Sequence, residues 1–250
     1  RKISRMLNKI KAFDKAHVAV SFAALKTSES IASFQADHYM TPASNIKLLT
    51  FLAAVESFDS LPSLYYHEID SVTHIKSTGY PLLLHPLYPD LELSSFLKQK
   101  QFLVYHKPKS KLKSQGSGWS WDDYSYYYAS ETSPFPIYGN AIQASGDSNV
   151  PKFTPSIFET LSSTDTLAKN FIRERFKNRF HYNPKKWNLR DTLYRPFVTS
   201  DDVFVQLLKN YLNRPVRLLT GSKNFEWKLL YTNQEELLYR AFLQESDNGI

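Results

Sequence analysis

Cysteine is missing from the 250 residues of this chain, and long apolar runs are missing as well. Without cysteine there is no disulfide bond, no thiolate nucleophile and no cysteine-ligated metal, although the compartment stays undecided. None of the apolar runs reaches the length that a membrane-spanning helix needs. The seven histidines are scattered, with no His-x-x-x-His or Glu-x-x-His pair, so the sequence predicts neither a metal nor a cofactor.

A signal peptide is also missing from residues 1–11, where charges alternate with apolar side chains as in an amphipathic helix. If the protein is exported, we expect its signal to have been removed already. The overall composition, 42% hydrophobic and 15% aromatic, is typical of a globular protein. Its length allows one large domain or two to three smaller ones.

The chain carries a net charge of +7, which suits an anionic partner such as a nucleic acid, an acidic membrane or a cell-wall polymer. Much of this charge lies in the run 98–113, KQKQFLVYHKPKSKLK. One interpretation takes Phe102, Tyr105 and the lysines as a surface that stacks on bases and binds phosphates. The other takes 102–105 as a strand followed by a solvated loop. We favour the second, and predict no nucleic-acid partner.

Ser44 and Lys47 form the motif that says most about function. They are three residues apart at the expected first turn of a helix, so their side chains share one face. A lysine amine placed in this way can serve as the base for a serine nucleophile without a histidine. Pro42 and Ala43 precede the serine, which is typical of a helix start.

The same Ser-x-x-Lys pattern occurs at Ser95 and at Ser110, where the surroundings are polar and rich in lysine. Any one match, taken alone, is most simply a solvated surface pair. The run 48–55 after Lys47, LLTFLAAV, is apolar on nearly every side and predicts a buried helix. A polar pair at the mouth of a buried helix distinguishes the first match from the other two.

Apolar periodicity predicts an α+β arrangement in which the motif follows a helix and a hairpin. Strands are expected at 17–25 and 31–36, and the motif helix at 44–58. Residues 79–86 suggest a buried turn, and the region 63–196 is rich in tyrosine, proline and short β-like stretches.

Helical patterns return in the last third of the chain. One helix is expected at 167–180. A second should begin at Ser200, whose side chain caps the first turn, and a third should end at residue 244. For the last of these helices, Thr232 and Glu235 have the spacing of a capping box.

Ser246, Asp247 and Asn248 follow this last helix and form the second motif. A serine that relays a proton and an amide that binds a carbonyl would line a cleft in this position. Three residues are a weak signal, and a plain helix C-terminal turn is the alternative. Together with Ser44 and Lys47, however, they match two of the three motifs of penicillin-recognising serine enzymes.

The chain resembles the D-alanyl-D-alanine carboxypeptidase/endopeptidase family of low-molecular-mass penicillin-binding proteins, the class with a large insertion between the first two motifs. Four segments, in the family's order, carry the resemblance: 42–47, 78–86, 118–123 and 244–248. Ser246 follows Ser44 by about 200 residues, a gap that argues against a class A β-lactamase.

The resemblance implies a β-lactamase-like transpeptidase domain, incomplete, with a β-rich inserted region. Ser44 would be the acylated nucleophile and Lys47 its proton acceptor. Ser246 and Asn248 would assist proton transfer and hold the substrate peptide. The reaction would cleave D-Ala-D-Ala stem peptides of peptidoglycan through an acyl-enzyme, and β-lactams would acylate the same serine. Location in the periplasm or cell envelope follows from this substrate.

Asp123 aligns with an acidic position of the family that recognises the free amine of diaminopimelate in the stem peptide. The alternative is an aspartate that only stabilises a turn beside Trp121.

The chain departs from the family in two respects. A Lys-Thr-Gly motif does not follow Asn248, and Tyr80 stands where the family usually has aspartate. We therefore expect a member truncated before its third motif, with the catalytic domain at 1–62 and 226–250 and inserted domains at 63–225. A protein of the same fold that binds peptidoglycan or a partner without catalysis is the alternative function.

Overall fold

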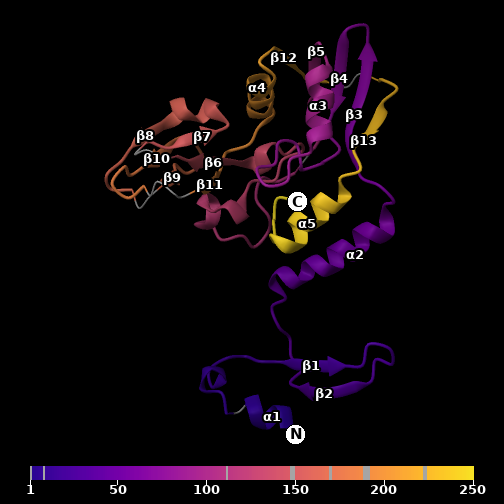
Figure 1. Cartoon of the computed structure of the whole chain (residues 1–250), viewed down its shortest axis with the longest axis vertical. Helices are drawn as coiled ribbons and strands as arrows, with labels where there is room; N and C mark the ends of the chain where they lie inside the picture. Colours follow the sequence, from indigo (N-terminus) through magenta and orange to yellow (C-terminus); the bar gives the residue numbers. More distant parts are fainter. Residues whose placement is uncertain are drawn as a thin grey trace. The chain divides into compact units, whose positions relative to one another are not determined.

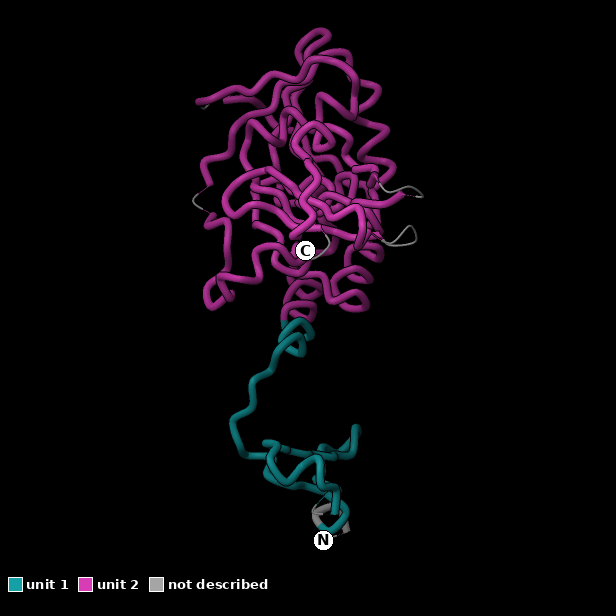
Figure 2. The backbone as a smooth tube through the Cα atoms, turned by 90° about the vertical axis from the view of Figure 1, so that its left-hand side faces the viewer, with its two compact units in different colours: residues 1–49 teal, residues 50–250 magenta. Residues whose placement is uncertain are grey.

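The computed structural model describes residues 2–7, 9–110, 112–146, 150–168, 171–187, 192–221 and 224–250. Two compact units are separable, one formed by residues 1–49 and the other by residues 50–250 (Figure 2). The predicted three-part division at residues 62 and 225 stays a prediction.

The first unit is built on a two-stranded antiparallel hairpin, β1 (Val20–Ala23) and β2 (Ser30–Phe34). The short helix α1 (Lys2–Leu7) lies against β2. Both predicted strands and the N-terminal helix are therefore confirmed, each shorter than the sequence suggested. Alternation of apolar and polar residues makes such strands recognisable without tertiary information.

The helix α2 (Lys47–Ser57) begins in the first unit and continues into the second, directly after a 3-10 turn at Ala43–Ile46. The prediction that this helix is buried is wrong. Its residues Leu48, Leu49, Leu52 and Val55 are 61%, 63%, 50% and 43% exposed, whereas Lys47 is only 9% exposed. An apolar run predicts a helix well, but it does not say whether anything covers the apolar surface.

The second unit is organised around a five-stranded mixed sheet in the order β12-β5-β4-β3-β13. Strands β4, β5 and β12 are parallel, and β3 pairs antiparallel with β4 on one side and β13 on the other. The bounds are β3 Pro62–Ile69, β4 Val72–Lys76, β5 Phe102–His106, β12 Val216–Leu219 and β13 Lys228–Tyr231. β5 confirms the strand expected at 102–105.

Three helices accompany this sheet in the chain. They are α3 (Leu91–Gln99), α4 (Asp201–Leu212) and α5 (Glu235–Gln244). α4 packs on β12, and its N-cap Ser200 accepts a hydrogen bond from the Val203 N–H at 3.1 Å, as predicted. Parallel strands need crossover connections, and α3 supplies the one between β4 and β5 (Figure 1).

Two small three-stranded sheets lie beside one another at the left of Figure 1. The first consists of β6 (Ala141–Ser145), β7 (Lys152–Thr154) and β11 (Leu193–Pro196), and the second of β8 (Ser162–Thr164), β9 (Phe171–Arg173) and β10 (Phe180–Tyr182). Five buried phenylalanines form their core: Phe153, Phe158, Phe171, Phe180 and Phe197. The fold is thus mixed helix and strand with a β-rich middle, as predicted.

The prediction of a helix at 167–180 is wrong for the residues of this range that the structure describes. Residues 171–182 form the antiparallel pair β9 and β10 instead. Phe176 has the spacing of a helical apolar face, but it lies in the turn with φ +60° and is 72% exposed. Phe171 and Phe180 pack into the phenylalanine core, and this packing outweighs the helical pattern.

The capping box predicted for the last helix is also wrong, although the helix itself is confirmed as α5. Its N-cap is Gln234. Thr232 is buried and donates to Asp90, while the Glu235 carboxylate accepts a hydrogen bond from the Leu61 N–H at 2.9 Å. Distant partners in the fold thus take both side chains away from the local cap.

None of the described helices is both long and apolar enough to cross a membrane.

Candidate functional site

Ser44 lies in the 3-10 turn that leads into α2, and Lys47 is the first residue of that helix. The backbone N–H of Lys47 donates to the carbonyls of Ser44 and Asn45. Ala43 has φ +45°, so the chain bends in the left-handed region directly before the serine. The serine is therefore presented at a bend immediately before the helix, and the lysine beside it is largely shielded from water.

Ser246, Asp247 and Asn248 lie where α5 ends, in the second unit. Ser246 has φ +53°, which turns the chain out of the helix, and the Asp247 N–H returns a hydrogen bond of 3.2 Å to the Ala241 carbonyl. The Asp247 carboxylate accepts from the Gly249 N–H at 2.7 Å. This closes a tight turn that fixes the motif. Ser44 and Lys47 belong to the other unit.

His85 supports this motif from the buried turn at 79–86. Its Nδ1 accepts hydrogen bonds from the backbone N–H groups of Leu87 and Tyr88 at 3.3 and 3.2 Å. The neutral ring therefore carries its proton on Nε2, which lies 3.2 Å from the Asp247 carboxylate and donates to it. His85 is 3% exposed. The ring thus links the backbone of one loop to the middle residue of the motif.

A second hydrogen bond joins the same two segments. The Tyr88 hydroxyl donates to the Glu245 carboxylate at 3.1 Å. Partial burial, together with this carboxylate, raises the pKa of Tyr88 above its ordinary value, so the phenol stays neutral and can donate. The segment 85–88 therefore holds the segment 245–248 at two points.

Asn248 and Asp123, both predicted site residues, are brought together by Tyr128. The Asn248 side-chain amide donates to the Tyr128 carbonyl at 3.0 Å, and the Tyr128 hydroxyl donates to the Asp123 carboxylate at 3.1 Å. All three line one cavity of about 360 Å³, with Trp119 and Gly118. Partial burial and Asp123 raise the pKa of Tyr128. This cavity is named the Asn248 cavity below.

Neither His85 nor Tyr128 was identified from the sequence. His85 belongs to one of the segments that carry the family resemblance, but nothing local connects it to a residue 162 positions later. Tyr128 is one of three consecutive tyrosines, and the sequence does not say which of them faces Asp123. Both connections are made by the tertiary fold alone.

Tyr80 belongs to a buried hydrogen-bond network. Its hydroxyl donates to the Asp90 carboxylate at 2.8 Å, and Thr232 donates to the same oxygen. Burial, and secondarily the Asp90 charge, raise the pKa of Tyr80 far above its ordinary value. Asp90 itself is fully buried and caps α3 by accepting from the Leu93 N–H at 2.8 Å. The Tyr80 phenol and the Thr232 hydroxyl, which lies between β13 and α5, thus both hold the capping residue of α3.

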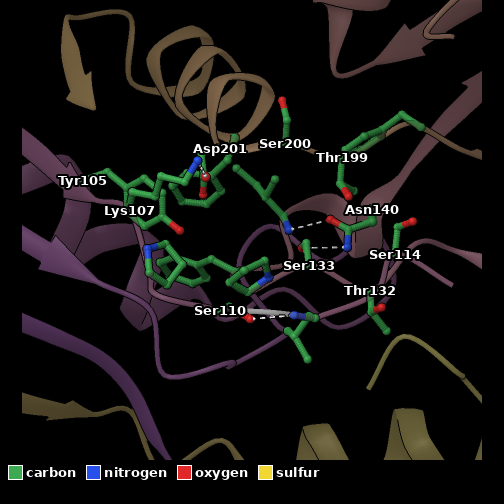
Figure 3. A pocket seen from close by; sticks show the side chains of 17 residues that line it. Tyr105, Lys107, Ser110, Ser114, Thr132, Ser133, Asn140, Thr199, Ser200 and Asp201 are labelled. Carbon is green, nitrogen blue, oxygen red and sulfur yellow. Dashed lines mark hydrogen bonds and ion pairs between the residues drawn. The ribbon is translucent and has the colours of Figure 1, made fainter. Parts of the chain in front are cut away.

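A further cavity of about 260 Å³ lies between the end of β5, the start of α4 and the loop 132–140 (Figure 3). Its charged groups are paired with each other, since Lys107 lies 3.3 Å from Asp201. The Asn140 amide donates to Ser133, and its oxygen accepts from the Ile137 N–H (Figure 3). These polar groups therefore stabilise the loops, and the cavity has no net charge from its lining.

Three lysines of the run 98–113 have separate structural roles. Lys98 lies over the Tyr211 ring at 4.8 Å, Lys100 pairs with Glu68 at 2.9 Å, and Lys107 pairs with Asp201. Lys109 and Lys113 lie in the segment that follows β5. Among the described residues, no group of three histidine, aspartate or glutamate side chains has the arrangement of a metal site.

The comparisons with known proteins agree with the resemblance predicted from the motifs. Residues 1–64, which include Ser44 and Lys47, match the model of the D-Ala-D-Ala carboxypeptidase 3 (S13) family. This match does not extend to Asp123, Ser246 or Asn248. No curated protein matches the chain in sequence.

Two crystal structures share the fold. One is penicillin binding protein 4 (dacB) from Haemophilus influenzae, with a TM-score of 0.69 and 18% identity over 100% of this chain. The other is the same Haemophilus protein complexed with a novel beta-lactam, with a TM-score of 0.56 and 15% identity. The chain spans 63% of the length of the first of these proteins and 62% of the second. The penicillin-binding-protein-like α+β fold is therefore confirmed.

Proposed function

We propose that this chain carries the acylation site of a serine-type D-Ala-D-Ala carboxypeptidase or endopeptidase that acts on peptidoglycan stem peptides. One observation carries the proposal: the segment that matches the S13 family, residues 1–64, contains the Ser44 and Lys47 motif at the start of a helix. The shared fold of the rest of the chain agrees with it.

In the proposed reaction the Ser44 hydroxyl attacks the carbonyl between the two D-alanines and Lys47 takes its proton. An amine must be neutral to accept a proton, and burial favours the neutral form of an amine. Lys47 is 9% exposed. The backbone N–H of Ser44, next to the start of α2, would stabilise the negative oxygen of the tetrahedral intermediate. Departure of D-alanine leaves an acyl-serine, which water hydrolyses.

Ser246 and Asn248 have supporting roles in this proposal. The serine relays a proton to the leaving amine, and the amide of Asn248 holds the substrate peptide. Asp123 lines the Asn248 cavity and would bind a free amine on the stem peptide. The same serine would be acylated by β-lactams, and the site of action would be the periplasm or cell envelope.

A fluorescent penicillin tests the nucleophile directly. The full-length gene product is purified, incubated with the reagent and analysed by intact-protein mass spectrometry. We expect one adduct, which is lost in Ser44→Ala. Ser95→Ala and Ser110→Ala are matched controls, because both serines lie in the same Ser-x-x-Lys pattern. An adduct that survives Ser44→Ala would contradict the assignment.

Peptide hydrolysis separates catalysis from binding alone. A stem peptide that ends in D-Ala-D-Ala should lose D-alanine with the wild type and not with Ser44→Ala. Sedimentation with purified cell walls, unchanged by Ser44→Ala and accompanied by no acylation, would instead favour the non-catalytic alternative.

A further inference from the structure

The cavity of about 260 Å³ between β5, α4 and the loop 132–140 has a lining rich in hydroxyl groups, and we name it the hydroxyl cavity. Three separate stretches of the chain contribute serines and threonines to it. They are Ser110, Ser114, Thr132, Ser133, Thr199 and Ser200, all labelled in Figure 3. The fold thus gathers hydroxyl groups from distant parts of the sequence around one cavity.

Three of these hydroxyls use their oxygen atom within the protein. The Ser110 oxygen accepts from the backbone N–H two residues later at 3.1 Å, and the Ser200 oxygen accepts from an N–H in the first turn of α4 at 3.1 Å. The Ser133 oxygen accepts from the Asn140 side-chain amide at 2.9 Å. In the part of the chain that the structure describes, none of these three hydroxyls donates a hydrogen bond. Each of them can therefore donate its hydrogen to a ligand.

Two further hydroxyls are used in the opposite way. The Thr132 hydroxyl donates to the Lys113 carbonyl, and the Thr199 hydroxyl donates to the Glu131 carboxylate at 3.0 Å. Their hydrogens are engaged, whereas their oxygens keep lone pairs that can accept. Thr132 and Thr199 directly precede two of the donating serines in the sequence. Donors and acceptors therefore alternate along the lining, and a ligand rich in hydroxyls matches this pattern because each of its hydroxyls both donates and accepts.

The charges of the lining disfavour an ionic ligand. Among the described residues that line the cavity, Lys107 and Asp201 are the only charged ones, and they pair at 3.3 Å. Burial, and secondarily the Asp201 charge, raises the pKa of Tyr105, so its phenol stays protonated and donates to the same carboxylate. An anion near Lys107 would meet Asp201, and a cation near Asp201 would meet Lys107. The lining therefore favours a neutral ligand.

The remaining lining is apolar and rigid. Phe135 and Phe204 line the cavity with stacked rings whose centroids are 4.9 Å apart, and neither residue is more than 5% exposed. A sugar ring has the matching division, with hydroxyls at its rim and C–H groups on its faces. The volume of about 260 Å³ lies below the roughly 300–1,000 Å³ of sites for drug-sized ligands. It therefore suits a ligand of about one ring.

We propose that the hydroxyl cavity binds one neutral sugar residue. The hydroxyls of the sugar would accept from Ser110, Ser133 and Ser200 and donate to the two threonine oxygens, with one face of the ring against the phenylalanines. The sugar can be free or can belong to a glycan strand. This site does not depend on the proposed acylation, because none of its residues takes part in that reaction.

Ligand-observed NMR titrations with four ring compounds test the chemistry of the ligand. Methyl glucoside is neutral and rich in hydroxyls, glucuronate is anionic, glucosamine is cationic, and cyclohexanol keeps the ring with a single hydroxyl. We expect saturable binding of methyl glucoside and at least about tenfold weaker binding of the other three. Equal binding of methyl glucoside and cyclohexanol, or no binding of methyl glucoside, would overturn the proposal.

Competition separates the two sources of the sugar. Glycan strands of peptidoglycan, freed of their peptides, are added to the complex with methyl glucoside. Displacement would assign the cavity to a sugar within a strand, and retention of methyl glucoside would assign it to a free sugar.

Variants locate the binding. Ser110→Ala and Ser133→Ala should each weaken the binding of methyl glucoside about three- to tenfold, because each removes one donor to the ligand. Both should fold, since Ser110 is exposed and the Asn140 amide keeps a second bond, of 2.8 Å, to the Glu131 carbonyl. Ser156→Ala, an exposed change outside the lining, is the matched control. Unchanged binding in both lining variants, with unfolding midpoints like that of the wild type, would place the sugar elsewhere and overturn the proposal.

A last measurement keeps the two proposals apart. Binding of methyl glucoside is repeated on Ser44→Ala, and we expect the same affinity as in the wild type. A protein that binds the sugar but is not acylated by penicillin would overturn the peptidase proposal alone. A protein that is acylated but does not bind the sugar would overturn the sugar site alone.

Discussion

The ring of His85 donates from Nε2 to the Asp247 carboxylate at 3.2 Å, across 162 positions of sequence. The same ring accepts two backbone N–H groups at Nδ1. These three hydrogen bonds use both ring nitrogens, so one side chain fixes a loop and the turn that contains Ser246 and Asn248. The position of the predicted motif in this fold therefore depends on a histidine outside it.

Replacing His85 should consequently destabilise the protein and loosen the motif. In His85→Ala two partly buried backbone donors and one carboxylate oxygen lose their buried partner, and we expect a loss of about 2–4 kcal/mol in the free energy of unfolding. Tyr88→Phe, which removes only the bond to Glu245, should lose about 0.5–1.5 kcal/mol. Urea unfolding measures both. A His85→Ala protein as stable as Tyr88→Phe would show that the ring is not the main link.

Asp90 is the second position where we expect a large loss. It is fully buried, caps α3 and accepts hydrogen bonds from Tyr80 and Thr232. Asp90→Ala leaves three donors without an acceptor in the interior, so the free energy of unfolding should fall by about 3 kcal/mol or more. Glu92→Ala, an exposed change in the first turn of the same helix, is the control and should stay within 0.5 kcal/mol of the wild type.

The Glu68 and Lys100 pair gives the free energy of unfolding a small dependence on pH. The hydrogen bond from Lys100, at 2.9 Å, lowers the pKa of Glu68 below its ordinary value of 4.5. A lowered pKa in the folded state means that the contribution is present above pH 4.5 and is lost as pH falls through the folded value. The Glu68 side chain is 43% exposed, so the contribution should be no more than about 0.5 kcal/mol.

Comparing Glu68→Gln with the wild type over pH 2–7 measures this contribution. The difference in unfolding free energy should be largest near pH 7, shrink below pH 4.5 and diminish in high salt. A difference that grows on acidification would have the wrong sign for a lowered pKa and would refute the assignment.

Local sequence patterns predicted the elements whose determinants lie within a few residues. The β1 and β2 hairpin follows from alternating apolar residues, and α4 follows from the Ser200 cap and two acidic residues in its first turn. The failures have a common cause. Thr232 was expected to cap α5 but instead joins a buried network with Asp90, and Phe176 was expected in a helix but lies in a turn. In both places distant packing overrides a local preference.

The candidate site divides in the same way. Ser44 and Lys47 could be proposed from sequence because three-residue spacing is a local property of a helix start. The proximity of Asp123 and Asn248 could be expected only from the family resemblance, and Tyr128, which joins them, could not be expected at all. Contacts between residues more than 100 positions apart depend on how β3, β13 and α5 assemble, and no short pattern encodes that.

Lys47 offers a stringent test of the proposed base. Removing a general base typically slows a reaction 10²–10⁴-fold, so Lys47→Ala should reduce the rate of acylation by a fluorescent penicillin at least about a hundredfold. Lys98→Ala, the lysine of the second Ser-x-x-Lys match, is the control and should acylate at the wild-type rate. Stopped-flow fluorescence gives both rates. Equal slowing in the two variants would point to a general effect of charge and not to a base.

We expect Asp123 to recognise a free amine on the substrate and to have no part in cleaving the scissile bond. It lines the Asn248 cavity and is held by the Tyr128 hydroxyl, so its carboxylate has a fixed position from which to pair with a substrate ammonium. We expect Asp123→Asn to lower kcat/KM at least tenfold for a D-Ala-D-Ala peptide with a free side-chain amine. For the same peptide with that amine acetylated, kcat/KM should be nearly equal in the variant and the wild type. Tyr128→Phe removes the hydrogen bond to the Asp123 carboxylate but keeps its charge. For the peptide with the free amine, its kcat/KM should lie between those of the wild type and Asp123→Asn. An equal loss on both peptides would mean that Asp123 only stabilises its turn.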